Sequence, residues 1–146
     1  MAKNKFNELY FDLEKTKEFF RKNGKDKLII DYLLQKGIES QEYISFFQKN
    51  GGGFLQYNTL LINVEEFSID TFLGSSDESI YDLIKCNEMM NVDNSKLVAI
   101  ATCVGDDLIC LKPHDPGVYY CQLDDIESDN LEKLADSFNA FLKLIC

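Results

Sequence analysis

The period of the hydrophobic residues changes along the chain, and this change limits the fold more than any other feature. Before residue 96 most apolar residues recur every three or four positions between charged ones, which is typical of amphipathic helices. From Lys96 to about Leu123 they form short, nearly continuous runs separated by turn residues, which is typical of buried strands. The sequence therefore predicts an α+β fold, a single domain with helices packed on a mostly antiparallel sheet of about four to six strands.

Five segments have helical spacing and suitable residues at their ends. The expected helices cover residues 5–22, 28–36, 40–50, 77–90 and 131–145. Ser40 is expected to cap the third helix and Ser76 or Asp77 the fourth, because a side-chain oxygen there accepts an unpaired backbone N–H. The buried faces of the second and fourth helices are expected to include Leu28, Ile29, Leu33, Ile80 and Leu83.

Four segments are expected to be strands, namely residues 59–64, 96–103, 108–111 and 118–123. Turn residues separate the last three strands, with Gly105-Asp106-Asp107 in the first gap and Asp115-Pro116-Gly117 in the second. Short connections of this kind join antiparallel neighbours, so these strands are expected to form a meander.

The charge of the chain is strongly negative and uneven. The net charge is -10 and the pI is about 4.5. Residues 1–27 hold eight basic and five acidic residues, a net charge of +3, so the remainder holds 7 basic and 20 acidic residues, a net charge of -13. This balance argues against binding to nucleic acids or anionic membranes, which require clustered cations. It suits solubility alone, or a basic partner that binds the later region.

The sequence is expected to belong to a cytoplasmic protein. The N-terminal residues contain no apolar run typical of a signal peptide, and no run approaches the roughly 18 apolar residues of a membrane helix. The five cysteines are an odd number without a CxxC pair, which is typical of free thiols. Cys103 and Cys110 are close enough in sequence to face each other across a hairpin, so a bond between them stays open.

Three features suggest chemistry, but each has a simpler structural explanation. The glycines at 51–53 follow a helix and lack the Gly-Lys-Ser/Thr of a phosphate-binding loop, so they are expected to end that helix. His114 lies in a turn and is expected to be solvated. The pairs Asp106-Asp107 and Asp124-Asp125 lack the further ligands of a cation site. We therefore expect no enzyme, cofactor or metal; an enzyme that uses His114 or the aspartate pairs is the alternative.

The acidic residues of the later region are candidates for partner binding, although a solvated surface is the simpler interpretation. The expected helix over 77–90 and the nearby turns could together form one negative surface, which would speed the capture of a basic partner. Tyr119 and Tyr120 alternate across one strand, so at most one should face the core, and the other is an exposed aromatic candidate. The candidate residues are Asp77, Glu78, Asp82, Glu88, Asp106, Asp107, Asp115, Tyr120, Asp124 and Asp125.

Several segments in succession resemble the SUKH superfamily, in its Smi/Knr group. The segment 40–52 is similar to that group's helix and its Asn-Gly-Gly stop, and Phe67–Gly74 is similar to its strand and Phe-x-Gly turn. The further similar segments are Val98–Ala101, Gly105–Leu111, Gly117–Tyr120 and Leu134–Leu142. The chain departs from the pattern at Ser40-Gln41, where the family often has Pro, and after Tyr120, where it often has an aromatic and His-Glu.

This resemblance covers about residues 38–145 and implies both a fold and a function. It implies a SUKH-like domain over 38–146, preceded by an N-terminal helical extension over 1–37. Bacterial members are commonly non-catalytic immunity proteins encoded beside polymorphic toxins, often nucleases or deaminases. The implied partner is thus a cognate toxin, and the acidic composition suits a basic one. The alternative is a regulatory or scaffold protein of the Smi/Knr type.

Overall fold

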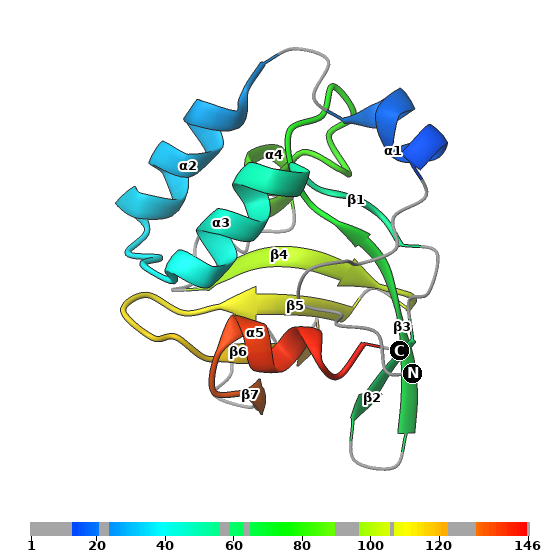
Figure 1. Cartoon of the computed structure of the whole chain (residues 1–146), viewed down its shortest axis with the longest axis vertical. Helices are drawn as coiled ribbons and strands as arrows, with labels where there is room; N and C mark the ends of the chain where they lie inside the picture. Colours follow the sequence, from blue (N-terminus) through cyan, green and yellow to red (C-terminus); the bar gives the residue numbers. More distant parts are fainter. Residues whose placement is uncertain are drawn as a thin grey trace.

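The computed structural model describes residues 13–20, 24–55, 59–62, 65–89, 97–105, 107–122 and 131–145. Over these residues helices pack on one antiparallel sheet and share one hydrophobic core with it (Figure 1). The α+β class, the single domain and the mostly antiparallel sheet expected from the sequence are therefore confirmed.

Seven described strands form the sheet, and every pairing between them is antiparallel. They are β1 (Gly53–Phe54), β2 (Thr59–Ile62), β3 (Glu65–Phe72), β4 (Val98–Cys103), β5 (Asp107–Leu111), β6 (Val118–Gln122) and β7 (Glu132–Ala135). Their order across the sheet is β1-β3-β4-β5-β6-β7, and β2 pairs with residues 65–68 of β3.

Strands β4, β5 and β6 form the meander that the apolar runs predict. Leu108 of β5 lies opposite Thr102 of β4 on one side and Cys121 of β6 on the other. Nearly all side chains of these strands are buried, whichever face of the sheet they occupy. Burial on both faces explains why the sequence shows continuous apolar runs here instead of an alternation of apolar and polar residues.

The described helices are α1 (Leu13–Phe19), α2 (Asp26–Gln35), α3 (Gln41–Asn50), α4 (Leu83–Met89) and α5 (Phe138–Leu142). Helices α2 and α3 confirm the second and third expected helices, and the hydroxyl of Ser40 accepts the backbone N–H of Tyr43 at 3.2 Å, as a cap should. The expectation for Leu28 is wrong, because its side chain is 61% exposed. The buried stripe of α2 follows Ile29 and Leu33, and Leu28 lies a quarter turn away.

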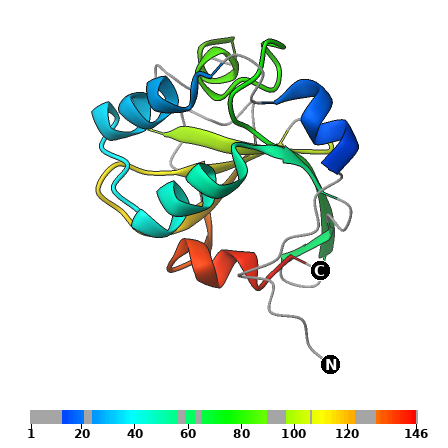
Figure 2. The same ribbon diagram turned by 45° about the horizontal axis from the view of Figure 1, so that its top comes forward.

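An aromatic cluster joins α3, α5 and the sheet. The ring centroid of Phe138 in α5 lies 5.2 Å from that of Tyr43 and 5.0 Å from that of Phe46. Phe46 also lies 5.1 Å from Phe72 of β3. Figures 1 and 2 show α5 beside α3, with α1 on the opposite side of the molecule from α2. The two helices are therefore anchored to the sheet through one continuous apolar contact.

The three glycines after α3 form the helix-terminating turn expected from the sequence. Gly51 has a φ of 69°, in the left-handed region, and its N–H donates to the carbonyl of Phe47 at 2.7 Å. Gly74, just after β3, must be glycine for a different reason, which is close packing against this turn. A Cβ atom on Gly74 would lie 1.8 Å from the carbonyl oxygen of Gly51, so the end of β3 passes directly against this turn.

The helix expected over residues 77–90 is shorter than predicted, because α4 begins at Leu83. The preceding residues form a loop that returns to the end of β3. The N–H of Gly74 donates to the carbonyl of Tyr81 at 3.0 Å, and the N–H of Leu83 donates to the carbonyl of Gly74 at 2.8 Å. These bonds hold the backbone out of a helix, so the expected cap at Ser76 or Asp77 is wrong.

The helix expected over residues 131–145 is also wrong in its first part. Residues 132–135 form β7, which pairs with β6 and places Ala135 opposite Val118. The helix begins only after Ser137, whose hydroxyl accepts the N–H of Ala140 at 3.1 Å. Four residues with one leucine and one alanine fit either a strand or a helix, and pairing with β6 decides between them.

The described part of the N-terminal expected helix is α1. The remaining residues of that prediction, 5–12 and 21–22, lie outside the described part of the chain, as do residues 63–64 of the first expected strand. The expected helical stop at Asn23-Gly24 is described only at Gly24, which has a φ of 69°.

Candidate partner-binding surface

The loop between β3 and α4 is held in place by one of the candidate residues, Asp82. Its side chain is only 2% exposed. One carboxylate oxygen accepts the backbone N–H of Ser76 at 3.2 Å, and the other accepts that of Lys85 at 3.1 Å. Asp82 was expected on an exposed acidic face; that placement is wrong, because the carboxylate caps α4 and pairs the loop backbone instead.

This use of Asp82 leaves Asp77 and Glu78 exposed at the tip of the same loop. The N–H of Glu78 donates to the hydroxyl oxygen of Ser76 at 3.0 Å, and the carbonyl of Glu78 accepts the N–H of Tyr81 at 3.0 Å. Ile80, expected on the buried face of a helix, is instead 54% exposed beside these carboxylates. The loop thus presents two acidic side chains and one large apolar side chain to solvent.

Helix α1 packs against this loop through a cluster of aromatic rings, which we call the α1 aromatic cluster: Phe19, Phe20, Phe54 and Tyr81. Phe54 and Tyr81 lie 5.0 Å apart between ring centroids, and Phe19 lies 5.8 Å from Phe54 and 5.4 Å from Tyr81. Phe20 is buried and lies 5.6 Å from Phe54. The cluster joins α1 to β1 and to the loop.

Two backbone contacts fix α1 at this position. The N–H of Phe54 in β1 donates to the hydroxyl oxygen of Thr16 at 3.0 Å. Phe20, directly after the helix, forms an antiparallel bridge with Ser76. These contacts determine where the neighbouring side chains of Glu18 and Phe19 lie.

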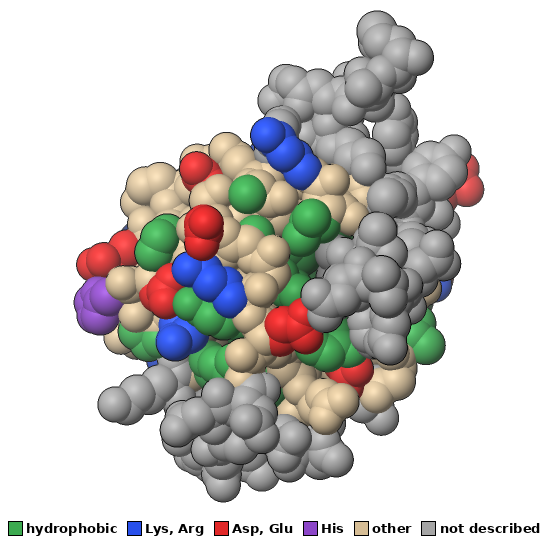
Figure 3. Space-filling model, turned by 90° about the horizontal axis from the view of Figure 1, so that it is seen from below, with side chains coloured by type: hydrophobic (Ala, Val, Ile, Leu, Met, Phe, Trp, Pro, Cys, Tyr) green, Lys and Arg blue, Asp and Glu red, His purple; other side chains and the backbone are tan. Residues whose placement is uncertain are grey.

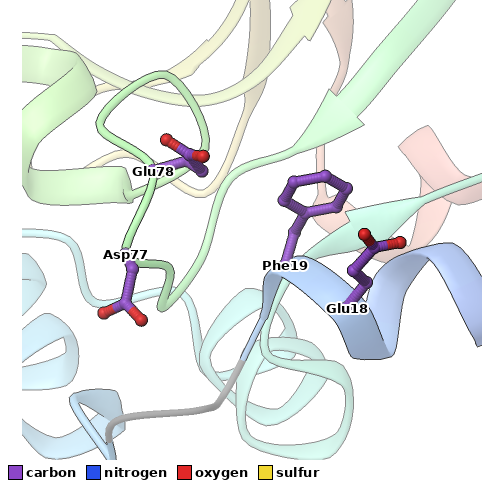
Figure 4. A pocket seen from close by; sticks show the side chains of 4 residues that line it. All are labelled: Glu18, Phe19, Asp77 and Glu78. Carbon is purple, nitrogen blue, oxygen red and sulfur yellow. The ribbon is translucent and has the colours of Figure 1, made fainter.

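A cleft of about 280 Å³ lies between α1 and the loop, lined by Glu18, Phe19, Asp77 and Glu78. Figure 4 shows the Phe19 ring between the carboxylates of Glu18 and Glu78, with Asp77 further along the loop. All three acidic side chains are exposed, whereas Phe19 is half-buried. Among the described residues, neither Glu18 nor Glu78 forms an ion pair with a lysine or arginine. The cleft therefore combines negative charge with an aromatic surface.

Glu18 and Phe19 were not among the residues selected from the sequence. The excess of positive charge over residues 1–27 directed attention to the later region. The adjacent pair Phe19-Phe20 was the available sign, because neighbours in the expected helix point about 100° apart and need not be buried to the same extent. Here Phe20 enters the core while Phe19 reaches the cleft.

Of the other acidic candidates, the structure describes Glu88, Asp107 and Asp115, and these three lie on different elements. Glu88 is exposed on α4. Asp107 begins β5 and Asp115 lies in the turn after it, so the two are separated by the length of that strand, about 16 Å. Asp106, Asp124 and Asp125 lie outside the described residues. Figure 3, seen from below, shows acidic and basic side chains interspersed over the described part of that face.

Tyr120 was expected as an exposed aromatic residue, and this is wrong. Its side chain is 7% exposed and lies in the hydrophobic core, where its hydroxyl donates to a carboxylate oxygen of Asp107. Burial and this hydrogen bond raise the pKa of Tyr120. Tyr119 is also buried, at 8% exposure, because the Lys112 ammonium lies 4.8 Å from its ring centroid and Asp115 accepts its hydroxyl. Tyr119 and Tyr120 do point to opposite faces of the sheet, but both faces are covered at this place, so both side chains are buried.

Asp115 stabilises the turn between β5 and β6, which also contains His114. One carboxylate oxygen of Asp115 accepts the Tyr119 hydroxyl at 2.7 Å and the other accepts the N–H of Gly117 at 2.8 Å, and the bond from Tyr119 is the main reason that the pKa of Asp115 is lowered. His114 has a φ of 58° and lies 3.3 Å from Glu39 through its Nδ1 atom. Its side chain is 70% exposed, which confirms the expectation of a solvated histidine.

The four described cysteines are free and buried, and their chemistry is that of apolar side chains. Burial raises the pKa of Cys86 to about 11 and that of Cys103 to about 12, and it raises the pKa of Cys110 as well. The idea that Cys103 faces Cys110 across a hairpin is wrong. The β4–β5 register, shifted by a bulge after Ala99, places Cys110 opposite Ala99.

Metal-binding clusters and membrane-spanning helices are two further features that the described part of the chain lacks. No group of three or more His, Cys, Asp or Glu side chains in this part of the chain is arranged to hold a metal ion. None of the helices described above has the length and apolar character to cross a membrane.

The comparisons with known proteins agree with the fold. A family model described as the SMI1 / KNR4 family (SUKH-1) matches residues 40–144. The match begins at the residue that caps α3 and includes the whole sheet, α4 and α5, whereas α1 and α2 precede it. No curated protein matches the chain.

Proposed function

The chain belongs to the SMI1/KNR4 family (SUKH-1), and from this premise we propose that it is a non-enzymatic module that binds and neutralises a cognate protein toxin. Family membership is the main support for the proposal, because bacterial members of the SUKH superfamily are commonly immunity proteins of this kind. The proposed partner is a basic polymorphic toxin of nuclease or deaminase type, and the proposed compartment is the cytoplasm. Neutralisation would consist of covering or distorting the toxin's active site.

The charge of the chain supports a basic partner. The net charge of -10 would accelerate encounter with a positively charged protein and disfavour acidic competitors. Nucleases must attract phosphate groups, so their binding surfaces are commonly basic. An acidic inhibitor fits such a surface better than a neutral one.

The cleft between α1 and the loop supports a location for the contact. Its exposed carboxylates supply charge, and its half-buried Phe19 supplies apolar surface. Ile80 of the same loop, which is 54% exposed, adds apolar surface outside the lining of the cleft. Interfaces of high affinity commonly place a few large side chains at the centre and polar groups around them. Of the candidates selected from the sequence, Asp77 and Glu78 meet this description, and Glu88 remains a peripheral candidate.

The placement of the nucleophilic residue types supports a binding role over an enzymatic one. His114 is solvated and contacts Glu39, and burial raises the pKa of the thiols of Cys86, Cys103 and Cys110. A thiolate is the reactive form of cysteine, and these pKa values leave very little of it at neutral pH.

Co-expression with the product of the adjacent gene tests the proposal. We expect that product to be toxic when expressed alone, growth to be restored by this chain, and the two proteins to be recovered together in a pull-down that weakens at high salt. A neighbour that is not toxic, or toxicity that this chain does not relieve, would contradict the immunity role and favour a regulatory or scaffold protein.

A further inference from the structure

We infer that the cleft formed by Glu18, Phe19, Asp77 and Glu78 receives a lysine or arginine side chain of the protein partner. The inference rests on the proposed function, in that it assumes a basic protein partner, and it specifies where and how one residue of that partner is recognised. Its basis is the combination in one cleft of three carboxylates and an aromatic ring from two separate parts of the chain.

The carboxylates and the ring suit the two parts of a basic side chain. Glu18 and Glu78 lie on either side of the Phe19 ring, and both are exposed and without a cationic partner among the described residues. An ammonium or guanidinium group can bind carboxylate oxygens while its aliphatic stem, or the guanidinium plane itself, packs on the ring. An acidic or apolar side chain would leave these carboxylates unpaired.

The chain itself supplies a second observation that points to a cation. The ammonium of Lys15 lies 4.3 Å from the centroid of Phe54, in the same α1 aromatic cluster that contains Phe19. A ring of this cluster therefore already binds a lysine ammonium on its face. Phe19 is the member of the cluster that lines the open cleft.

The size of the cleft favours one side chain over a cofactor or a metal ion. Its volume of about 280 Å³ is just below the range of roughly 300–1,000 Å³ that encloses drug-sized ligands. The described carboxylates are not arranged as a metal-binding group. A single long side chain needs less space than a cofactor and can enter from an exposed surface.

Several of the contacts that hold the cleft come from residues outside its lining. Asp82 fixes the loop that bears Asp77 and Glu78, and the bond from the N–H of Phe54 to Thr16 fixes the helix that bears Glu18. A cleft held in this way loses little entropy when a side chain enters. Because α1 precedes the family match at residues 40–144, half of the cleft comes from outside the family domain.

Titration of the full chain with Nα-acetyl-arginine-N-methylamide, followed by NMR of the backbone amides, tests this inference. We expect saturable shift changes concentrated at residues 18–20 and 76–81, and binding about five-fold tighter than that of the uncharged norleucine analogue. The double variant E18Q/E78Q should weaken arginine binding about five-fold. The matched control E14Q/D31N removes two exposed carboxylates outside the cleft and should change arginine binding less than about two-fold.

Shift changes spread evenly over all exposed acidic residues, or equal loss of binding in the two double variants, would overturn the inference. Failure here is distinguishable from failure of the proposed function. If the chain rescues growth but does not bind the arginine probe at the cleft, the immunity role stands and the cleft assignment falls. If the probe binds at the cleft but the neighbouring product is not toxic, the cleft assignment stands and the immunity role falls.

Discussion

Individual acidic residues of this chain have different tasks, although composition treats them alike. Asp82 is buried and pairs backbone N–H groups, whereas Glu78, four residues earlier in the same loop, is exposed and lines the cleft. Asp115 is intermediate in exposure, and its carboxylate accepts a hydrogen bond from the Tyr119 hydroxyl. The sequence identifies all three as candidates, but only the hydrogen bonds of the folded chain separate structural carboxylates from those available to a partner.

Replacement of Asp82 by alanine should destabilise the protein by about 1–3 kcal/mol, because it removes the cap of α4 and leaves a buried N–H of Ser76 unpaired. Urea unfolding followed by circular dichroism measures the loss. Glu88→Ala, an exposed change on the same helix, should remain within about 0.5 kcal/mol of the parent protein. Equal stability of the two variants would contradict the structural role of Asp82.

The Tyr119 hydroxyl should make part of the acid stability depend on Asp115. Because the folded pKa of Asp115 is lowered, its ionised form contributes stability above its unfolded pKa of about 3.9, and this contribution is lost as pH falls through the folded pKa. Tyr119→Phe removes the main hydrogen bond and should raise the pKa of Asp115 toward its ordinary value. NMR titration of the side-chain carboxyl measures the change, and identical titration in both proteins would contradict the assignment.

At the scale of elements, the meander was predictable because each strand carries an unbroken apolar run and each connection carries turn residues. Helix α3 was predictable because Ser40 and Gly51 mark its two ends. The helices expected over 77–90 and 131–145 were wrong in their first parts, where long-range contacts determine the secondary structure. Residues 132–135 pair with β6, and the loop before α4 bonds back to Gly74; neither partner is visible in the local pattern. The local pattern also does not indicate that Asn87 is buried.

The buried side chain of Asn87 connects α4 to β4. Its amide nitrogen donates to the carbonyls of Leu83 and Ala99 at 2.8 and 3.0 Å, and its oxygen accepts the N–H of Ala99 at 2.8 Å. Asn87→Leu keeps the volume but leaves both backbone groups of Ala99 unpaired in the interior. We expect a loss of about 2–4 kcal/mol in unfolding free energy and faster hydrogen exchange at the Ala99 amide. Unchanged exchange at that amide would show that the connection is not needed.

At the scale of the whole molecule, the family and the fold were predictable, and the arrangement of the charged surface was not. The match to residues 40–144 agrees with the resemblance seen over about 38–145. The position of α1 was not predictable, because it depends on the α1 aromatic cluster, whose members are far apart in sequence. The separation of the chain into an extension over 1–37 and a domain from residue 38 stays a prediction, with Ile29 and Leu33 of α2 already in the common core.

The central claim is that the chain neutralises its partner by stoichiometric binding. Its most direct test is to titrate the activity of the purified product of the adjacent gene with this protein at low and high salt. We expect activity to fall linearly to zero at about one equivalent, with weaker inhibition at high salt because the attraction between the two proteins is screened. Full activity in the presence of excess protein would contradict neutralisation, and complete loss of activity at a small fraction of an equivalent would show that the chain acts as a catalyst.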